Sequence, residues 1–163
     1  HKGSPLAIQA LVRKAEIEEQ RFLPAKAIET YPQLNAASRS DQLTAANDLR
    51  RAVALLDLHQ DDQALAVFRR MDGDPLVPFQ QACVAGYHIG ATLERAGRLD
   101  EAMGAYESFV RKYEKREELK QNPELAELLA SAKWKLDKVK WLKSLSAVAQ
   151  RGFIPRPAPP KGE

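Results

Sequence analysis

A small residue followed four positions later by an aromatic one recurs three times along this chain. The pairs are Ala27–Tyr31, Ala64–Phe68 and Ala102–Tyr106. Their alanines lie 37 and then 38 residues apart. Residues four apart share one face of a helix, so each pair sets a small residue beside a large ring. Two helices that meet closely across a short turn need this arrangement. The spacing therefore predicts a series of helix–turn–helix units.

The copy at residues 86–106 is the most complete of the three. It places small residues at Gly90, Gly97 and Ala102, with larger apolar residues between them. Gly90 would let the first helix approach the second, and Gly97 suits the turn between them. This stretch resembles the tetratricopeptide repeat, a helix–turn–helix unit of about 34 residues. Residues 55–68 overlay it without a gap, and residues 22–31 form a third, weaker copy.

The resemblance covers approximately residues 8–115 and departs from the family pattern at two positions of the best copy. Gly86 stands where a large apolar residue is usual, and Glu114 stands where the family places a proline. The resemblance implies an all-α fold, an α-solenoid of about three such helix pairs. The alternative is that ordinary amphipathic helix pairs share this spacing by chance.

Helix-forming residues and turn signals predict seven helices. They span approximately residues 5–20, 24–31, 41–58, 61–71, 79–96, 100–120 and 124–149. The second is expected to end near Tyr31, because Pro32 disfavours helix in the residue before it. The last is expected to be a C-terminal capping helix that covers the open end of the repeats. Residues 1–150 would then form one repeat domain, and residues 151–163 a proline-rich tail or linker.

The last helix carries a second apolar stripe that includes Trp134 and Trp141, seven residues apart. These tryptophans either belong to the cap or form an interface for a partner or for a second copy, which would make the protein a homo-oligomer. The same helix carries five lysines, and residues 111–163 have a net charge of +6 against −3 for residues 1–110. A solvated face, an acidic protein partner, and nucleic acid or lipid are the three interpretations. The lysines spread around the helix instead of forming one stripe, and the pattern is not the aromatic–basic interleaving typical of RNA platforms, so we expect no nucleic-acid contact.

The residues that could carry chemistry do not gather into a catalytic motif. The three histidines are far apart in sequence, no metal-ligand spacing is present, and no glycine loop could cradle a phosphate. The single cysteine, Cys83, excludes an internal disulfide and is expected to be a small buried residue. We therefore expect no enzyme activity, catalytic residue, metal or cofactor.

The sequence leaves the compartment open. No run of about 20 apolar residues is present, so membrane contact is expected only through an anchor outside this sequence. Because the chain begins with His1, a leader or anchor could precede it. The expectation is a soluble domain, either cytoplasmic or periplasmic and membrane-tethered.

The resemblance implies a scaffold that binds a peptide or protein segment in a concave groove. The groove positions of the family, carried onto this sequence, are Leu49, Arg50, Val53, Asp57, Tyr87, His88, Ala91, Glu94 and Arg95. Tyr87 is the expected anchor. Leu49 and Tyr87 stand where some family members clamp a C-terminal carboxylate with asparagine, so that function is not expected. A structural or oligomerising module of a larger, membrane-associated or other assembly is the alternative, and an accessory role in an enzyme is a third.

Overall fold

The computed structural model describes residues 3–38 and 40–151, without the side chains of residues 120 and 146–151. The regular secondary structure of these residues is all helical, and they contain no strand. Its helices are α1 (Pro5–Gln20), α2 (Pro24–Ala37), α3 (Asp41–Asp57), α4 (Asp61–Gly73), α5 (Phe79–Arg95), α6 (Leu99–Tyr113), α7 (Glu117–Gln121) and α8 (Pro123–Arg151).

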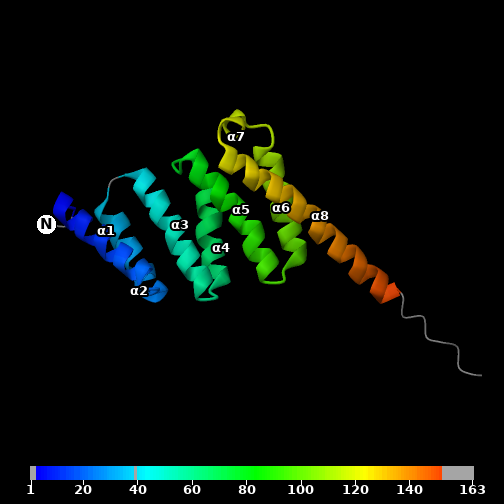
Figure 1. The fold of residues 1–163 in the computed structure, drawn as a ribbon, viewed down its shortest axis with the longest axis horizontal. Helices are drawn as coiled ribbons and strands as arrows, with labels where there is room; N and C mark the ends of the chain where they lie inside the picture. Colours follow the sequence, from blue (N-terminus) through cyan, green and yellow to red (C-terminus); the bar gives the residue numbers. More distant parts are fainter. Residues whose placement is uncertain (1–2, 39, 152–163) are drawn as a thin grey trace, which may run out of the picture.

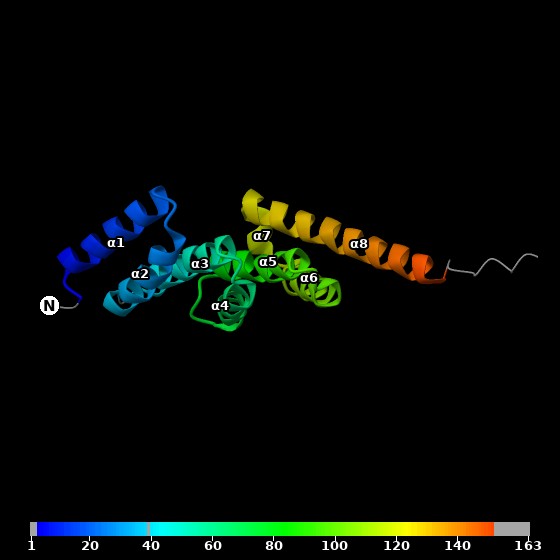
Figure 2. The same cartoon turned by 90° about the horizontal axis from the view of Figure 1, so that it is seen from below.

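The first six helices form three antiparallel pairs that stand side by side (Figure 1). Each helix packs against the next one in the chain, and α3 also packs against α5. As a result α1, α3, α5 and α8 lie on one side of the array, while α2, α4 and α6 lie on the other (Figure 2). The described chain is therefore an α-solenoid of three helix pairs followed by a long C-terminal helix, as expected from the sequence.

The three turns within the pairs have the same backbone conformation. One residue in each turn has a positive φ: 53° at Phe22, 57° at His59 and 72° at Gly97. The next N–H donates to the carbonyl five residues before it, in the hydrogen bonds Leu23 to Glu18 (2.8 Å), Gln60 to Leu55 (2.9 Å) and Arg98 to Leu93 (2.9 Å). This is the Schellman arrangement that commonly ends a helix. The three units therefore share a turn conformation although the residue with positive φ is of a different type in each.

The recurring pairs of small and aromatic residues form the centre of each unit. The rings of Tyr31, Phe68 and Tyr106 are fully buried. Each ring lies beside a small residue of the first helix of its pair, namely Ala15, Ala52 and Gly90, respectively. These three small residues are again 37 and 38 positions apart. A Cβ added at Gly90 would lie 2.5 Å from the Tyr106 ring. Helix separation in the third pair thus depends on the absence of a side chain there.

The structure corrects the expected end of the second helix. α2 continues through Pro32 to Ala37 instead of ending near Tyr31. Leu34 is buried, and the Asn35 side chain donates to Asp48 (3.1 Å) and accepts from Asn47 (2.8 Å), both on α3. These contacts outweigh the loss of one backbone hydrogen bond at an exposed proline.

The expected helix over residues 100–120 is also corrected, because it is divided in two. α6 ends at Tyr113, and the short α7 follows at Glu117–Gln121. Leu119 of α7 is buried in the same apolar cluster as Leu125 of α8. The break lets the chain fold back, so that α8 packs along α6 and α5. Its buried residues Leu125, Ala132 and Val139 cover the end of the third pair, as expected of a cap.

Candidate functional site

α3 lies on the side of the array that α1, α5 and α8 share (Figure 2). Four of the expected groove residues lie on α3 at helical spacing, and we call them the α3 face: Leu49, Arg50, Val53 and Asp57. Leu49 is half-buried and packs against the core of the middle pair, whereas the other three are exposed. Val53 is 44% exposed, which is unusual for a large apolar side chain in this structure. Arg50 and Asp57 are exposed, and neither forms an ion pair within the described residues. The α3 face therefore offers an exposed valine between an arginine and an aspartate that form no ion pair within the described residues.

The expected groove residues of α5 are in a different situation, because α8 lies against them. The hydroxyls of Tyr87 and Ser131 share a hydrogen bond of 3.0 Å across the two helices. The Tyr87 ring packs edge-on against Phe109, with centroids 6.1 Å apart. Tyr87, the expected anchor, is thus half-buried, and its hydroxyl has a hydrogen-bond partner within the chain.

His88 and Ala91 are also half-buried. The His88 imidazole stacks on the Phe68 ring of α4, with centroids 5.1 Å apart and planes 12° from parallel. Burial lowers the pKa of His88, because a charged imidazolium loses hydration there. His88 therefore joins two helix pairs rather than offering a charge to a ligand.

Glu94 and Arg95 are the last two expected groove residues, and both form polar contacts with neighbouring helices. Glu94 accepts hydrogen bonds from Tyr106 (3.0 Å), Lys135 (2.8 Å) and Lys138 (3.0 Å). Burial raises the pKa of Glu94, but these three donors outweigh it and keep the pKa below its ordinary value. Arg95 donates to the carbonyl of Leu56 at 3.1 Å and pairs with Asp61. Two of the groove charges are therefore satisfied within the fold.

The five lysines of α8 meet carboxylates on the helices beneath them. The pairs are Lys133–Glu114, Lys135–Glu94 (2.8 Å), Lys138–Glu94 (3.0 Å), Lys140–Glu107 (3.2 Å) and Lys143–Asp100. The acidic residues belong to α5 and α6 or directly follow α6. The positive charge of α8 is thus matched along its length by its own neighbours. Within the described residues, each of these lysines therefore has a carboxylate neighbour in its own chain.

A hollow of about 440 Å³ lies between α5 and α8. Its lining residues are Gln80, Val84, Glu124, Leu125, Glu127, Leu128 and Ser131. Val84 and Leu128 give it an apolar floor, and two glutamates of α8 give it an acidic rim. The sequence analysis named none of these α8 residues as groove residues, because the register of α8 on α5 depends on contacts between residues far apart in sequence.

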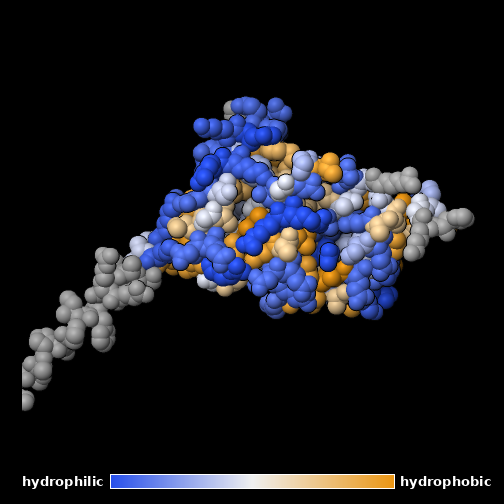
Figure 3. Space-filling view, turned by 180° about the vertical axis from the view of Figure 1, so that it is seen from behind, coloured by the Kyte–Doolittle hydropathy of each residue, from blue (hydrophilic) through white to orange (hydrophobic). Residues whose placement is uncertain are grey.

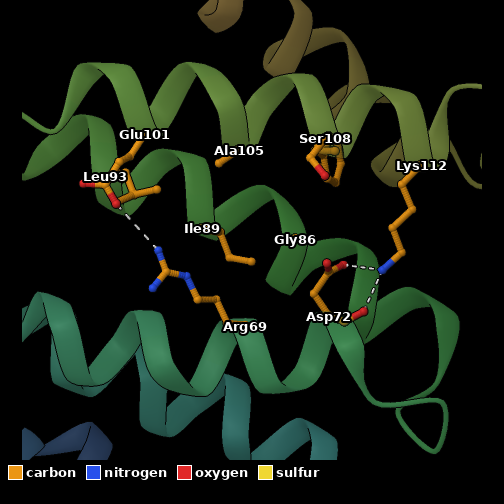
Figure 4. A pocket seen from close by; sticks show the side chains of 10 residues that line it. Arg69, Asp72, Gly86, Ile89, Leu93, Glu101, Ala105, Ser108 and Lys112 are labelled. Atoms are coloured by element: carbon orange, nitrogen blue, oxygen red, sulfur yellow. Dashed lines mark hydrogen bonds and ion pairs between the residues drawn. The ribbon is translucent and has the colours of Figure 1, made fainter.

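A second hollow, of about 360 Å³, lies on the opposite face between α4 and α6. Ile89 and Gly86 of α5 form its floor, and one ion pair spans it at each end: Arg69–Glu101 (4.0 Å) and Lys112–Asp72 (2.7 Å) (Figure 4). A space-filling view of this side shows hydrophobic residues between the charged ones (Figure 3). The ion pairs use the charges at this face, which makes it a weaker candidate than the α3 face.

The same hollow explains why Gly86 departs from the family pattern. A Cβ at Gly86 would lie 2.9 Å from the carboxylate of Asp72 and 3.2 Å from the Phe109 ring. Asp72 also accepts a hydrogen bond of 2.8 Å from Tyr113. The space of a large apolar residue is therefore filled by side chains from α4 and α6.

No group of three or more histidine, cysteine, aspartate or glutamate side chains within residues 3–38 and 40–151 could hold a metal. Cys83 is fully buried, and burial raises the pKa of its thiol to about 11. Its sulfur is therefore protonated and inaccessible at neutral pH. None of the helices described here is long and apolar enough to cross a membrane.

A family model described as tetratricopeptide repeat matches residues 84–115, which include most of α5 and all of α6. No curated protein and no solved structure matches the chain. Tetratricopeptide repeats are generally non-catalytic protein–protein interaction scaffolds. The two preceding helix pairs share the turn conformation and the buried aromatic position of the matched segment. Residues 84–115 are thus a tetratricopeptide repeat segment, the third of three similar helix pairs in this chain.

Proposed function

We propose that this protein is a non-catalytic scaffold that binds a peptide or protein segment on its concave face, centred on α3. The observation that carries the proposal is the exposed Val53 between the unpaired Arg50 and Asp57. These three residues are three and four positions apart, so they lie along one stripe of the helix. An apolar centre with polar residues around it is typical of protein interfaces.

The position of α8 supports α3 rather than α5 as the centre of the site. α8 covers Tyr87 and bonds Glu94, so these positions are already used within the chain. A segment that continues from α3 across α5 would reach the hollow between α5 and α8, where Glu124 and Glu127 are lining residues. A suitable segment would set an apolar side chain on Val53 and a basic residue near those glutamates.

Selection from a phage-displayed peptide library tests the proposal. Peptides enriched on the wild-type chain are synthesised, and their affinities are measured by fluorescence anisotropy. Val53→Asp places a charge at the apolar centre and is expected to weaken binding at least tenfold, about 1.4 kcal/mol. Leu76→Asp is the matched control, because Leu76 is 69% exposed and lies in the loop between α4 and α5.

The charges give a second arm to the same experiment. Arg50→Asp combined with Asp57→Arg keeps the net charge and reverses its direction along α3. Peptides selected on this variant should then carry the opposite order of charges from those selected on the wild type. Selected peptides that bind Val53→Asp and wild type equally well would place the site elsewhere.

A further inference from the structure

The outward face of α8 exposes a row of large apolar side chains. Trp134 is 62% exposed, Trp141 is 59% exposed and Leu145 is 46% exposed. The Lys138 ammonium lies 5.5 Å from the centre of the Trp134 ring, on a helix whose opposite side is buried against α6. α8 is an outermost helix of the array, and its C-terminal half projects past α6 (Figures 1 and 2). A second molecule could therefore approach this row without meeting the rest of the array.

The row has the same spacing when it is read in either direction. Ala130, Trp134, Trp141 and Leu145 are separated by four, seven and four residues, and the midpoint falls between Asp137 and Lys138. An antiparallel copy of α8, related by a two-fold axis at this midpoint, would set Trp134 against Trp141 of the second copy. The same operation sets the small Ala130 against the large Leu145. A second copy of this chain supplies the complementary pattern that an isologous interface requires.

The charges of α8 do not oppose this pairing. A helix with five lysines would ordinarily repel its own copy. Here each lysine faces a carboxylate of its own chain, and the tryptophans lie on the side away from α6. The side chains of the row itself are aromatic and aliphatic and carry no charge. A polyanion would therefore find no free cluster of cations along it.

We propose that α8 is the interface of a homodimer, in which two copies of the helix pair antiparallel through Trp134, Trp141 and Leu145. This goes beyond the peptide site on α3, since the row contains none of the groove residues. Two tryptophans and a leucine form a small interface compared with the usual area of about 800 Å² per partner. We therefore expect a dimer with a dissociation constant in the micromolar range.

Sedimentation velocity on the full chain tests the dimer directly. The weight-average mass should rise from monomer to dimer between about 1 µM and about 200 µM, a range that brackets the affinity expected for a small interface. Trp141→Glu should be monomeric throughout, with an unchanged circular dichroism spectrum because the residue is exposed. Leu76→Glu is the matched control and should dimerise like the wild type. A wild-type chain that stays monomeric over the whole range would overturn the proposal.

Disulfide trapping tests the antiparallel register. Asp137 lies next to the proposed two-fold axis, so Asp137→Cys should form a disulfide with itself in the second copy under mild oxidation. Ser144→Cys lies two turns further along the same flank. In the antiparallel pair its two copies would be about 20 Å apart, at 1.5 Å per residue, and should not bridge. Equal bridging at both positions indicates a parallel pair and overturns this register. The wild type serves as the blank, since Cys83 is buried.

Discussion

The middle and third helix pairs have the same backbone turn and the same close packing but reach them with different side chains. In the third pair, Tyr106 donates a hydrogen bond to Glu94, twelve residues earlier. At the corresponding positions the middle pair has Phe68 and Leu56. The first pair resembles the third, because the Tyr31 hydroxyl donates a hydrogen bond to Glu19 at the corresponding positions. The hydroxyl and the carboxylate are thus present together or absent together.

This paired change has a simple physical reason. A buried hydroxyl without a partner costs free energy, and so does a desolvated carboxylate without a donor. A repeat that loses one group is therefore more stable when it loses the other as well. The aromatic ring itself is kept in all three pairs, because its volume fills the space between the helices.

The largest expected effect concerns the close approach in the third pair. Gly90→Ala would bring a Cβ to 2.5 Å from the Tyr106 ring, and we expect a loss of about 2 to 3 kcal/mol in unfolding free energy. The corresponding Ala52 of the middle pair already accommodates a Cβ. Ala52→Gly should therefore cost only about 1 kcal/mol, chiefly through helix propensity. Urea denaturation measures both. Equal stability of Gly90→Ala and wild type would contradict the close contact.

The next effect tests the paired change in the middle repeat. Phe68→Tyr would place a hydroxyl opposite Leu56, which has no side-chain acceptor, and should cost about 2 kcal/mol. Leu56→Glu in the same chain supplies the acceptor found in the other two pairs. A double-mutant cycle should then give a favourable coupling of about 1 kcal/mol. If the losses in unfolding free energy of the two single variants simply add, the middle pair cannot form the tyrosine–glutamate hydrogen bond of the other two pairs.

A smaller effect concerns the turn residue of positive φ, which is a glycine in the third pair and a histidine in the middle pair. Gly97→Ala should destabilise the fold by about 1 kcal/mol, whereas His59→Gly should stabilise it by a similar amount. Gly104→Ala is a matched control, since both glycines have open space where a Cβ would lie. Gly104 is inside α6, so its replacement should stabilise. Thermal melts that show the same sign for Gly97→Ala and Gly104→Ala would contradict the left-handed turn.

The effect at the junction between the middle and third pairs is the smallest of the four near neutral pH. His88 stacks on Phe68, and its lowered pKa means that the unfolded chain binds its proton more readily than the folded one. Stability should therefore fall as the pH drops below about 6.5 toward the folded-state pKa, by at most about 1.4 kcal/mol per pH unit. His88→Phe keeps a ring at this position and should flatten the dependence between pH 7 and pH 5 (~two pH units). An unchanged slope in this variant would assign the effect to other groups.

The repeat itself could be predicted from the sequence. Ala-to-aromatic spacing is a local signal, and residues four apart share a helical face whatever surrounds them. The three pairs, the all-helical fold and the cap therefore followed from the chain alone. The helix starts at Pro5 and Pro24 also agreed with the structure, because proline is favoured in the first turn. These predictions were well supported because the same spacing of small and aromatic residues occurs in three copies.

Tertiary contacts decided what the local signals could not. Pro32 lies inside α2, because the burial of Leu34 and the bonds of Asn35 with α3 outweigh its local cost. Tyr87 occupies a groove position of the family, yet α8 covers it, since the register of α8 on α5 depends on contacts 44 residues apart in sequence. The same register leaves α3 open and turns Trp134 and Trp141 outward. The sequence alone determined the repeat, because its signals act within one helix pair. The exposed surfaces were decided only by the packing of distant helices, whose energies depend on which faces meet.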